Sequence, residues 1–196
     1  MVRMAWDEGM IGNQENKIAV VTGSNTGIGF HMARALASKG AEVLLACRSI
    51  EKAEDARRRI LEDFPGSLLR ISELDLADLS SIQDFSQRFS EENSRLDILI
   101  NNAGVMIPPK SRTKDGFELQ FGTNHLGHFA LTGRLLPILE ETQGSRIVCR
   151  GTPCSGAFST CSWRCRQGEV PRLPSMPQLS PMRWNTLTGD RPDSSK

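Results

Sequence analysis

The chain has 196 residues and a formal net charge of +1 at pH 7, with 38% hydrophobic and 24% charged residues. A chain of this length can bury a hydrophobic core, and its balanced charge gives no reason to expect a nucleic acid or an acidic membrane surface as a partner. No apolar run reaches the ~18 residues of a membrane span, and residues 1–16 lack the apolar centre of a signal peptide. The sequence therefore predicts a cytoplasmic protein with no membrane span.

Apolar runs alternate with amphipathic stretches from Lys17 to Val148. The apolar runs predict strands at residues 17–22, 42–46, 68–74, 96–100 and from 146 onward. The amphipathic stretches predict helices from the glycines at 27–29 to Gly40, from Ser49 to Phe64, over 79–93, and from about 116 to 141, where Pro137 should bend the helix or end it early. This alternation predicts an α/β fold with a doubly wound parallel sheet, the Rossmann architecture.

The composition changes abruptly at Cys149. Residues 149–196 hold six of the ten prolines and four of the five cysteines, and no helix or strand period can be found there. The predicted organisation is thus a loose leader at 1–16, a Rossmann region at 17–148 and a disordered tail at 149–196. The tail could come from an alternative exon, from a shifted reading frame or from a segment with its own function.

The cysteines of the tail predict no metal site. They are separated by four, six and three residues, unlike the paired short spacings of zinc sites. A disulfide framework would conflict with the cytoplasmic prediction. The four residues are Cys149, Cys154, Cys161 and Cys165.

A glycine-rich turn joins the first predicted strand to the helix that follows it. Its residues are Gly23, Ser24, Asn25, Thr26, Gly27, Ile28 and Gly29. Unpaired N–H groups at a helix N-terminus attract anions, and glycines let the backbone approach a pyrophosphate closely. A tight turn without a ligand is the alternative, but the strand–turn–helix context favours dinucleotide binding.

The residues that follow the second predicted strand indicate which cofactor is preferred. In a dinucleotide fold an acidic residue here would bind the ribose 2′-hydroxyl, whereas an arginine accommodates a 2′-phosphate. Residues 46–49 contain no Asp or Glu, and Arg48 offers a planar guanidinium that suits phosphate. The sequence therefore favours NADP over NAD, the alternative being that Arg48 is a solvated loop residue.

Polar residues also follow the third and fourth predicted strands. Asp75, which precedes Leu76, could accept a hydrogen bond from an adenine amino group or could stabilise the next turn. The segment from Asn101 to Gly104 should lie beside the cofactor, because ligands of such sheets bind at the carboxyl ends of the strands. It could equally be a structural turn.

Inside the long predicted helix, Asn124 stands between Gly122 and Gly127. Spacing alone favours a buried, hydrogen-bonded asparagine over a functional one. His125 and His128 are three residues apart, but two ligands do not make a metal site, so a solvated or packed pair is the better interpretation.

Together these motifs resemble the short-chain dehydrogenase/reductase family, most closely its retinol-dehydrogenase-like branch. The resemblance rests on Thr22–Gly29, the Asn-Asn-Ala-Gly segment at 101–104, Ala46–Ser49 and Phe121–Phe129, and it spans residues 17–148. It implies that Gly23, Gly27 and Gly29 line the pyrophosphate and that Arg48 meets the adenosine phosphate. It further places Asp75 near adenine and Asn102, Ala103 and Gly104 near the ribose and nicotinamide. Asn124 matches the family's catalytic asparagine.

The chain departs from the family after Val148. The family's catalytic serine and its Tyr-x-x-x-Lys helix have no counterpart, since Ser155 is out of place and the chain contains no tyrosine. The last two strands of the family are also missing, which predicts an unpaired edge at the fifth strand and an uncovered helix face with Leu126, Phe129 and Leu136. We therefore expect an NADP-dependent oxidoreductase fold, of a kind that interconverts hydroxyl and carbonyl groups, without catalytic competence. A non-catalytic NADP-binding or interaction protein and a gene-model artefact are the alternatives.

Overall fold

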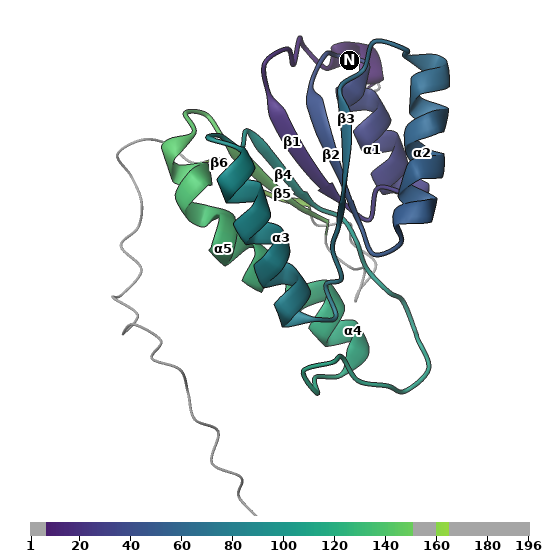
Figure 1. Ribbon diagram of the computed structural model, residues 1–196, viewed down its shortest axis with the longest axis vertical. Helices are drawn as coiled ribbons and strands as arrows, with labels where there is room; N and C mark the ends of the chain where they lie inside the picture. Colours follow the sequence, from purple (N-terminus) through teal and green to yellow (C-terminus); the bar gives the residue numbers. More distant parts are fainter. Residues whose placement is uncertain (1–6, 151–159, 165–196) are drawn as a thin grey trace, which may run out of the picture.

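A computed structural model describes residues 7–150 and 160–164 of the chain (Figure 1). In chain order the elements are η1 (Glu8–Met10, a 3₁₀ helix), β1 (Ile18–Thr22), α1 (Gly27–Ala37), β2 (Glu42–Cys47), α2 (Ile50–Asp63), β3 (Leu69–Glu73), α3 (Leu79–Glu92), β4 (Ile98–Asn101), α4 (Leu119–Phe121), η2 (Gly122–Gly127, a π-helix), α5 (His128–Glu141), β5 (Arg146–Arg150) and β6 (Thr160–Arg164).

One sheet organises the domain, with strand order β3-β2-β1-β4-β5-β6. The pairs among β1 to β5 are all parallel. Strands β2 and β3 lie on one side of β1, and the chain then crosses over so that β4 and β5 lie on the other side. This is the doubly wound Rossmann topology, so the predicted fold class is confirmed. The predicted strand boundaries agree with the structure to within two residues.

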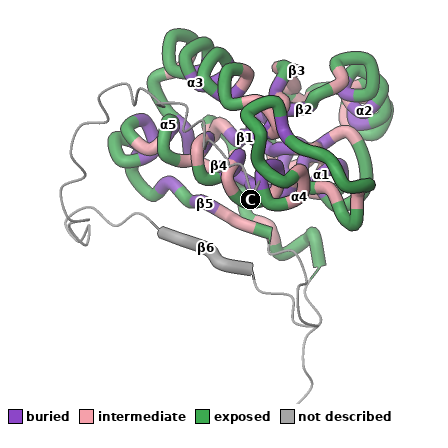
Figure 2. Tube along the Cα trace, turned by 90° about the horizontal axis from the view of Figure 1, so that it is seen from below, coloured by how far each residue is buried: buried purple, intermediate pink, exposed green. Residues whose placement is uncertain are grey.

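Two hydrophobic cores cover the two faces of the sheet (Figures 1 and 2). Successive residues of β1 divide between them, because side chains alternate along a strand: Ala19 and Val21 pack under α1 and α2, while Val20 packs under α3 and α5. All three are fully buried. A strand covered on both faces needs apolar residues throughout, and this explains the continuous apolar runs of the sequence.

The structure corrects the prediction that residues 149–196 contain no strand. β5 continues to Arg150, and β6 pairs antiparallel with it, from Arg146 opposite Arg164 to Arg150 opposite Thr160. The predicted unpaired edge at β5 is therefore wrong as well. Such pairing uses backbone N–H and C=O groups, which every residue but proline supplies, so β6 needs no apolar alternation. The rest of the predicted disordered tail, 151–159 and 165–196, lies outside the described residues.

The long predicted helix is divided into three elements, α4, η2 and α5, and starts at Leu119 rather than near residue 116. Pro137 does not end it, because α5 continues to Glu141. A proline inside a helix costs about 3 kcal/mol, but a buried leucine contributes roughly 1.5–3 kcal/mol. Leu135 before the proline and Leu139 after it are both fully buried. Packing on both sides therefore maintains the helix through the proline.

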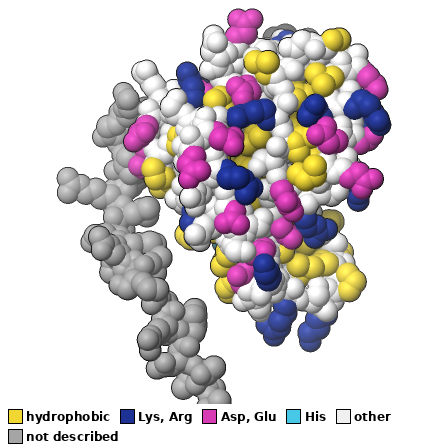
Figure 3. All heavy atoms as spheres, in the orientation of Figure 1, with side chains coloured by type: hydrophobic (Ala, Val, Ile, Leu, Met, Phe, Trp, Pro, Cys, Tyr) yellow, Lys and Arg dark blue, Asp and Glu magenta, His cyan; other side chains and the backbone are white. Residues whose placement is uncertain are grey.

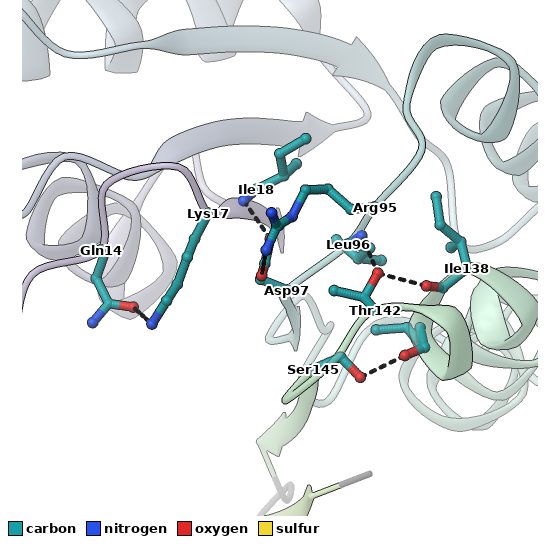
Figure 4. Close-up of polar contacts among 10 residues, drawn as sticks. Gln14, Lys17, Ile18, Arg95, Leu96, Asp97, Ile138, Thr142 and Ser145 are labelled. Carbon is teal, nitrogen blue, oxygen red and sulfur yellow. Dashed lines mark hydrogen bonds and ion pairs between the residues drawn. The ribbon is translucent and has the colours of Figure 1, made fainter. Parts of the chain in front are cut away.

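Polar contacts fix the amino ends of the central strands, opposite the edge where the glycine-rich turn and the turn after β4 lie (Figure 4). The Asp97 carboxylate accepts a hydrogen bond from the backbone N–H of Ile18 at 2.9 Å and also binds the Arg95 guanidinium. The Thr142 hydroxyl accepts from the N–H of Leu96 at 3.0 Å and donates to a carbonyl of α5. These bonds connect the starts of β1 and β4 to the end of α5.

The predicted leader is attached to the domain where the structure describes it. The N–H of Gln14 donates to the Lys39 carbonyl at 2.8 Å, and Lys17 bonds to the Gln14 side chain at 3.0 Å. Residues 1–6 of the leader lie outside the described residues. Within the described ranges, no helix combines the length and the apolar character that crossing a membrane requires.

The outward face of α5 is partly uncovered. Phe129 is 68% exposed, as the sequence predicted for this face. Leu126 and Leu136, predicted to be uncovered with it, are half-buried instead.

Candidate functional site

The candidate site lies where the parallel strands end. β1 leads into the glycine-rich turn, β4 leads into the turn at Asn102–Gly104, and β1 and β4 are neighbours in the sheet. The sheet reverses its strand order between these two strands, and ligands of open α/β sheets bind at such a point. The topology therefore brings the two predicted glycine-containing segments to one edge.

The N-terminus of α1 is open. Its N-cap residue, Thr26, makes no side-chain capping bond, whereas Ser49 caps α2 and Asp78 caps α3. The first N–H groups of a helix need an acceptor, and an anion can supply one. Gly27 has a left-handed backbone (φ +58°), and nothing lies within 4 Å of the position a Cβ would take there. This geometry leaves room above the turn for a phosphate group.

Gly29 lets the glycine-rich turn pack closely against the turn after β4. A Cβ at Gly29 would lie 2.3 Å from Asn102 Nδ2 and 2.5 Å from the Gly23 carbonyl oxygen. Only a glycine permits this approach of α1 to the turn after β4. Of the other residues of the glycine-rich turn, Asn25 is half-buried, while Thr26 and Ile28 are exposed.

Ser24 differs from the prediction that the turn's residues face a ligand. It is fully buried, and its Oγ lies 3.3 Å from Cys47 Sγ, so its side chain connects the turn to the end of β2. Burial raises the pKa of the Cys47 thiol and keeps it neutral. The next residue, Arg48, is exposed just beyond β2, on the same edge of the sheet.

Asp75 and Leu76 follow β3. The Asp75 Oδ1 accepts a hydrogen bond from the N–H of Ala77 at 2.9 Å, so the carboxylate stabilises the turn, which was one of its two predicted roles. Leu76 is buried and belongs to the core under α3 and α5. Its side chain therefore packs inside the protein.

Thr22, the last residue of β1, holds the turn after β4. Its Oγ1 accepts hydrogen bonds from the N–H of Asn102 at 2.9 Å and from the N–H of Ala103 at 3.0 Å. Asn102 also donates through its side-chain Nδ2 to the Thr22 carbonyl at 2.9 Å. Thr22 was not among the predicted site residues. A hydroxyl at the last position of a buried strand, next to a turn, was the signal for it.

Asn124 is half-buried in the π-helix η2 and binds the segment after Gly104. Its Oδ1 accepts from the N–H of Val105 at 2.8 Å, and its Nδ2 donates to the Val105 carbonyl at 2.8 Å. Both polar atoms of the side chain are thus used within the protein. The arrangement gives Asn124 a positioning role in this chain, and π-helical turns of this kind are often found at functional sites.

His128 is packed, which confirms one of the two states predicted for it. It is buried, its Nδ1 lies 3.0 Å from the Asn124 carbonyl oxygen, and its Nε2 lies 3.0 Å from Thr22 Oγ1. Burial lowers the pKa of its imidazole. His125, by contrast, is exposed and stacks on the Phe121 ring. The signal for His128 was its place on the buried stripe of α5 that contains Leu131 and Leu135.

Exposed apolar side chains form a rim on the segment between β4 and η2, which follows the turn at 102–104. Figure 3 shows hydrophobic groups gathered on the lobe that carries α4. Four large apolar residues between β4 and η2 are exposed, by 42% to 86%: Met106, Ile107, Phe117 and Phe121. Ile107 also has a left-handed backbone (φ +50°), which is uncommon for a β-branched residue.

This strand order and these two turns are typical of dinucleotide-binding proteins. The sequence profile of the short chain dehydrogenase family matches residues 17–152, about two thirds of the chain, and the chain therefore belongs to that family. Its curated relatives include retinol dehydrogenases. Mouse (Mus musculus) retinol dehydrogenase 12 is 52% identical over 132 residues, and human (Homo sapiens) retinol dehydrogenase 13 is 50% identical over 155 residues.

These matches cover 67% and 77% of this chain but 42% and 47% of the two relatives, so the chain spans less than half of their length. Among solved structures, the NADP active-site complex of Pseudomonas aeruginosa RhlG is similar with a TM-score of 0.63 and 28% identity. That likeness covers 76% of this chain and 60% of RhlG. The predicted family and its retinol-dehydrogenase-like branch are confirmed.

Proposed function

We propose that this chain is the nucleotide-binding part of an NADP-dependent short-chain dehydrogenase/reductase. The observation that carries the proposal is the uncapped N-terminus of α1 beside the turn held by Thr22. Gly23, Gly27 and Gly29 would hold the pyrophosphate, and Asn102, Ala103 and Gly104 would lie along the ribose and nicotinamide. The RhlG structure, which contains NADP, supports the choice of a nicotinamide dinucleotide.

Arg48 would select NADP over NAD. It is exposed at the end of β2, the ion pairs of the described residues do not include it, and no carboxylate occupies residues 46–49. A carboxylate there would repel a 2′-phosphate and would accept a hydrogen bond from a free 2′-hydroxyl. A guanidinium does the opposite.

Fluorescence titration with NADPH and NADH tests this proposal. The unmodified chain should bind NADPH at least ten times more tightly than NADH, and Arg48→Asp should reverse the order. Arg57→Asp, which changes the charge of a partly exposed arginine on α2 by the same amount, should keep the preference for NADPH. Equal affinities for the two cofactors in the unmodified chain would remove the role of Arg48.

The same proposal includes the absence of turnover. A bound nicotinamide exchanges a hydride with a carbonyl or alcohol carbon, and the oxygen of that substrate must gain or lose a proton. The chain contains no tyrosine to transfer that proton. Both polar atoms of the Asn124 side chain bond to Val105, and an amide group cannot act as a general acid. Steady-state assays with NADPH and a panel of aldehydes and ketones should show no rate above background. A rate that follows the purified protein would contradict this part.

A non-catalytic NADP-binding or interaction protein is the second candidate. The exposed apolar rim, which includes Met106 and Phe121, favours it, since contiguous apolar surface commonly marks interaction sites. Tight NADPH binding without turnover would agree with both candidates. Self-association measured by ultracentrifugation, abolished by Phe121→Ser but not by Ser94→Ala, would favour the second.

We further propose that the protein acts in the cytoplasm. The balanced charge of the sequence and its lack of a long apolar run support this location. Cell fractionation with an antibody against the chain tests it. Recovery in the membrane pellet after a high-salt wash would contradict it.

A further inference from the structure

A closed ring of hydrogen bonds connects three segments at the candidate site. Thr22 accepts from the turn at Asn102 and Ala103, this turn leads to Val105, and Val105 exchanges two bonds with Asn124. The Asn124 carbonyl contacts His128, and the other ring nitrogen of His128 returns to Thr22, 106 residues away in the sequence. His128 thus closes the ring.

The acceptors in this ring determine where the protons lie. A carbonyl oxygen has no proton to give, so His128 Nδ1 must carry a proton and donate it to the Asn124 carbonyl. A neutral imidazole has only one N–H, which leaves Nε2 as an acceptor. Thr22 must then direct its hydroxyl proton at Nε2, 3.0 Å away, rather than at the Ile100 carbonyl, 3.3 Å away.

This proton arrangement gives the hydroxyl of Thr22 a partner for its proton and for both of its lone pairs. With its proton on His128, the hydroxyl keeps two lone pairs, and these face the N–H groups of Asn102 and Ala103. A buried group with all its partners is rigid, whereas one lost partner leaves a costly unpaired donor or acceptor. The direction of one proton on Thr22 therefore stabilises the turn that lines the candidate site.

We propose that His128, as the neutral Nδ1–H tautomer, is a positioning residue that locks Asn124 and the turn at 102–105 to the end of β1. It touches neither cofactor nor substrate in this proposal and acts through Thr22 and Asn124. The π-helix η2 ends at Gly127, so His128 also fixes the point at which the regular helix α5 begins. The positioning itself is a property of the chain without ligand, and only its effect on cofactor affinity depends on the proposed function.

Nitrogen NMR of the unmodified chain, labelled with ¹⁵N-histidine, tests the tautomer directly. The chain contains three histidines, so three ring systems are observed, and the exposed His31 and His125 serve as internal references. At pH 8, His128 should show a protonated Nδ1 and an unprotonated Nε2. A protonated Nε2, or a mixture of tautomers like that of a solvated histidine, would overturn the proposal.

Amide exchange tests whether the ring depends on His128. His128→Phe keeps a flat aromatic ring, somewhat larger than imidazole, and removes both hydrogen bonds, and His125→Phe is the matched control on the preceding turn. In the folded His128→Phe variant, the amide of Val105 should exchange about tenfold faster, while that of Leu99 in the core should not change. An unchanged Val105 amide would mean that His128 only fills space. If this variant does not fold, the tautomer of the unmodified chain decides.

NADPH titration separates this inference from the proposed function. His128→Phe should weaken NADPH binding about fivefold and His125→Phe should not, because only the first loosens the turn. If the unmodified chain binds no NADPH, the proposed function fails, and the tautomer and the exchange rates still decide the role of His128. If NADPH binds equally well to both variants and the Val105 amide is unchanged, the positioning role is refuted.

Discussion

The carboxylate of Asp97 accepts the backbone N–H of Ile18 at 2.9 Å, and this bond joins the first residue of β1 to the residue before β4 (Figure 4). Asp97 is only 4% exposed and is held in place by the Arg95 guanidinium. The two strands it connects are those whose other ends form the candidate site. The amino edge of the sheet thus carries a structural anchor, and the carboxyl edge carries the site.

Asp97→Asn should lower the free energy of unfolding by about 2 kcal/mol, because the buried side chain loses its charge and one of the two oxygens that accept from Ile18 and Arg95. Urea denaturation measures it. Asp63→Asn is the control, since Asp63 pairs with Arg34 at an exposed position and should contribute less than about 1 kcal/mol. NADPH affinity of the folded Asp97→Asn variant should not change. A large loss of affinity would show that the two edges are coupled.

Gly29→Ala should destabilise the chain by roughly 1–3 kcal/mol and weaken NADPH binding, because the added Cβ would meet Asn102 and the Gly23 carbonyl. Gly133→Ala is the matched control. Gly133 lies in α5 with open space around it, so the same change should stabilise the helix by about 0.5–1 kcal/mol. Thermal unfolding and cofactor titration measure both effects. Equal behaviour of the two variants would contradict the packing argument.

The stability of the chain should depend on pH through His128. Burial lowers the pKa of His128 in the folded state, so below pH ~6.5 the unfolded chain binds a proton that the folded chain does not. The free energy of unfolding should therefore fall as the pH decreases from 7 to 5, by up to about 1.4 kcal/mol per pH unit. His128→Phe should reduce the slope of the free energy of unfolding against pH by the equivalent of about one bound proton. His31→Phe should leave this slope unchanged. A slope unchanged by His128→Phe would show that another group causes it.

The pKa of Asp78, the N-cap residue of α3, should depend on Lys114. The hydrogen bond from Lys114, followed by that from the Ser80 hydroxyl, lowers the pKa of Asp78 to about 2. The stabilisation that this gives is present above pH 3.8 and is lost as the pH falls toward 2. Lys114→Met should raise the pKa of Asp78 toward its ordinary value in an NMR titration, whereas Lys110→Met should not. An unshifted pKa in the Lys114 variant would mean that Ser80 alone holds the carboxylate.

The sequence by itself determined the elements and the class of the fold. The uninterrupted apolar run of β1 requires cover on both faces, and the amphipathic stretches between the strands supply it. The cap at Ser49 and the glycine-rich turn are local features whose geometry depends on neighbours in the chain. Local patterns of this kind can be predicted because the interacting residues are a few positions apart.

The tertiary structure decided what depends on distant partners. The bond between Thr22 and His128 joins residues 106 positions apart, and no local pattern shows that a histidine on the buried stripe of α5 will meet the end of β1. β6 was missed because edge pairing uses backbone groups and not a pattern of side chains. Pro137 does not end the helix early, because the packing of Leu135 and Leu139 outweighs its local cost. In each case a long-range contact, which the local sequence does not encode, determined the result.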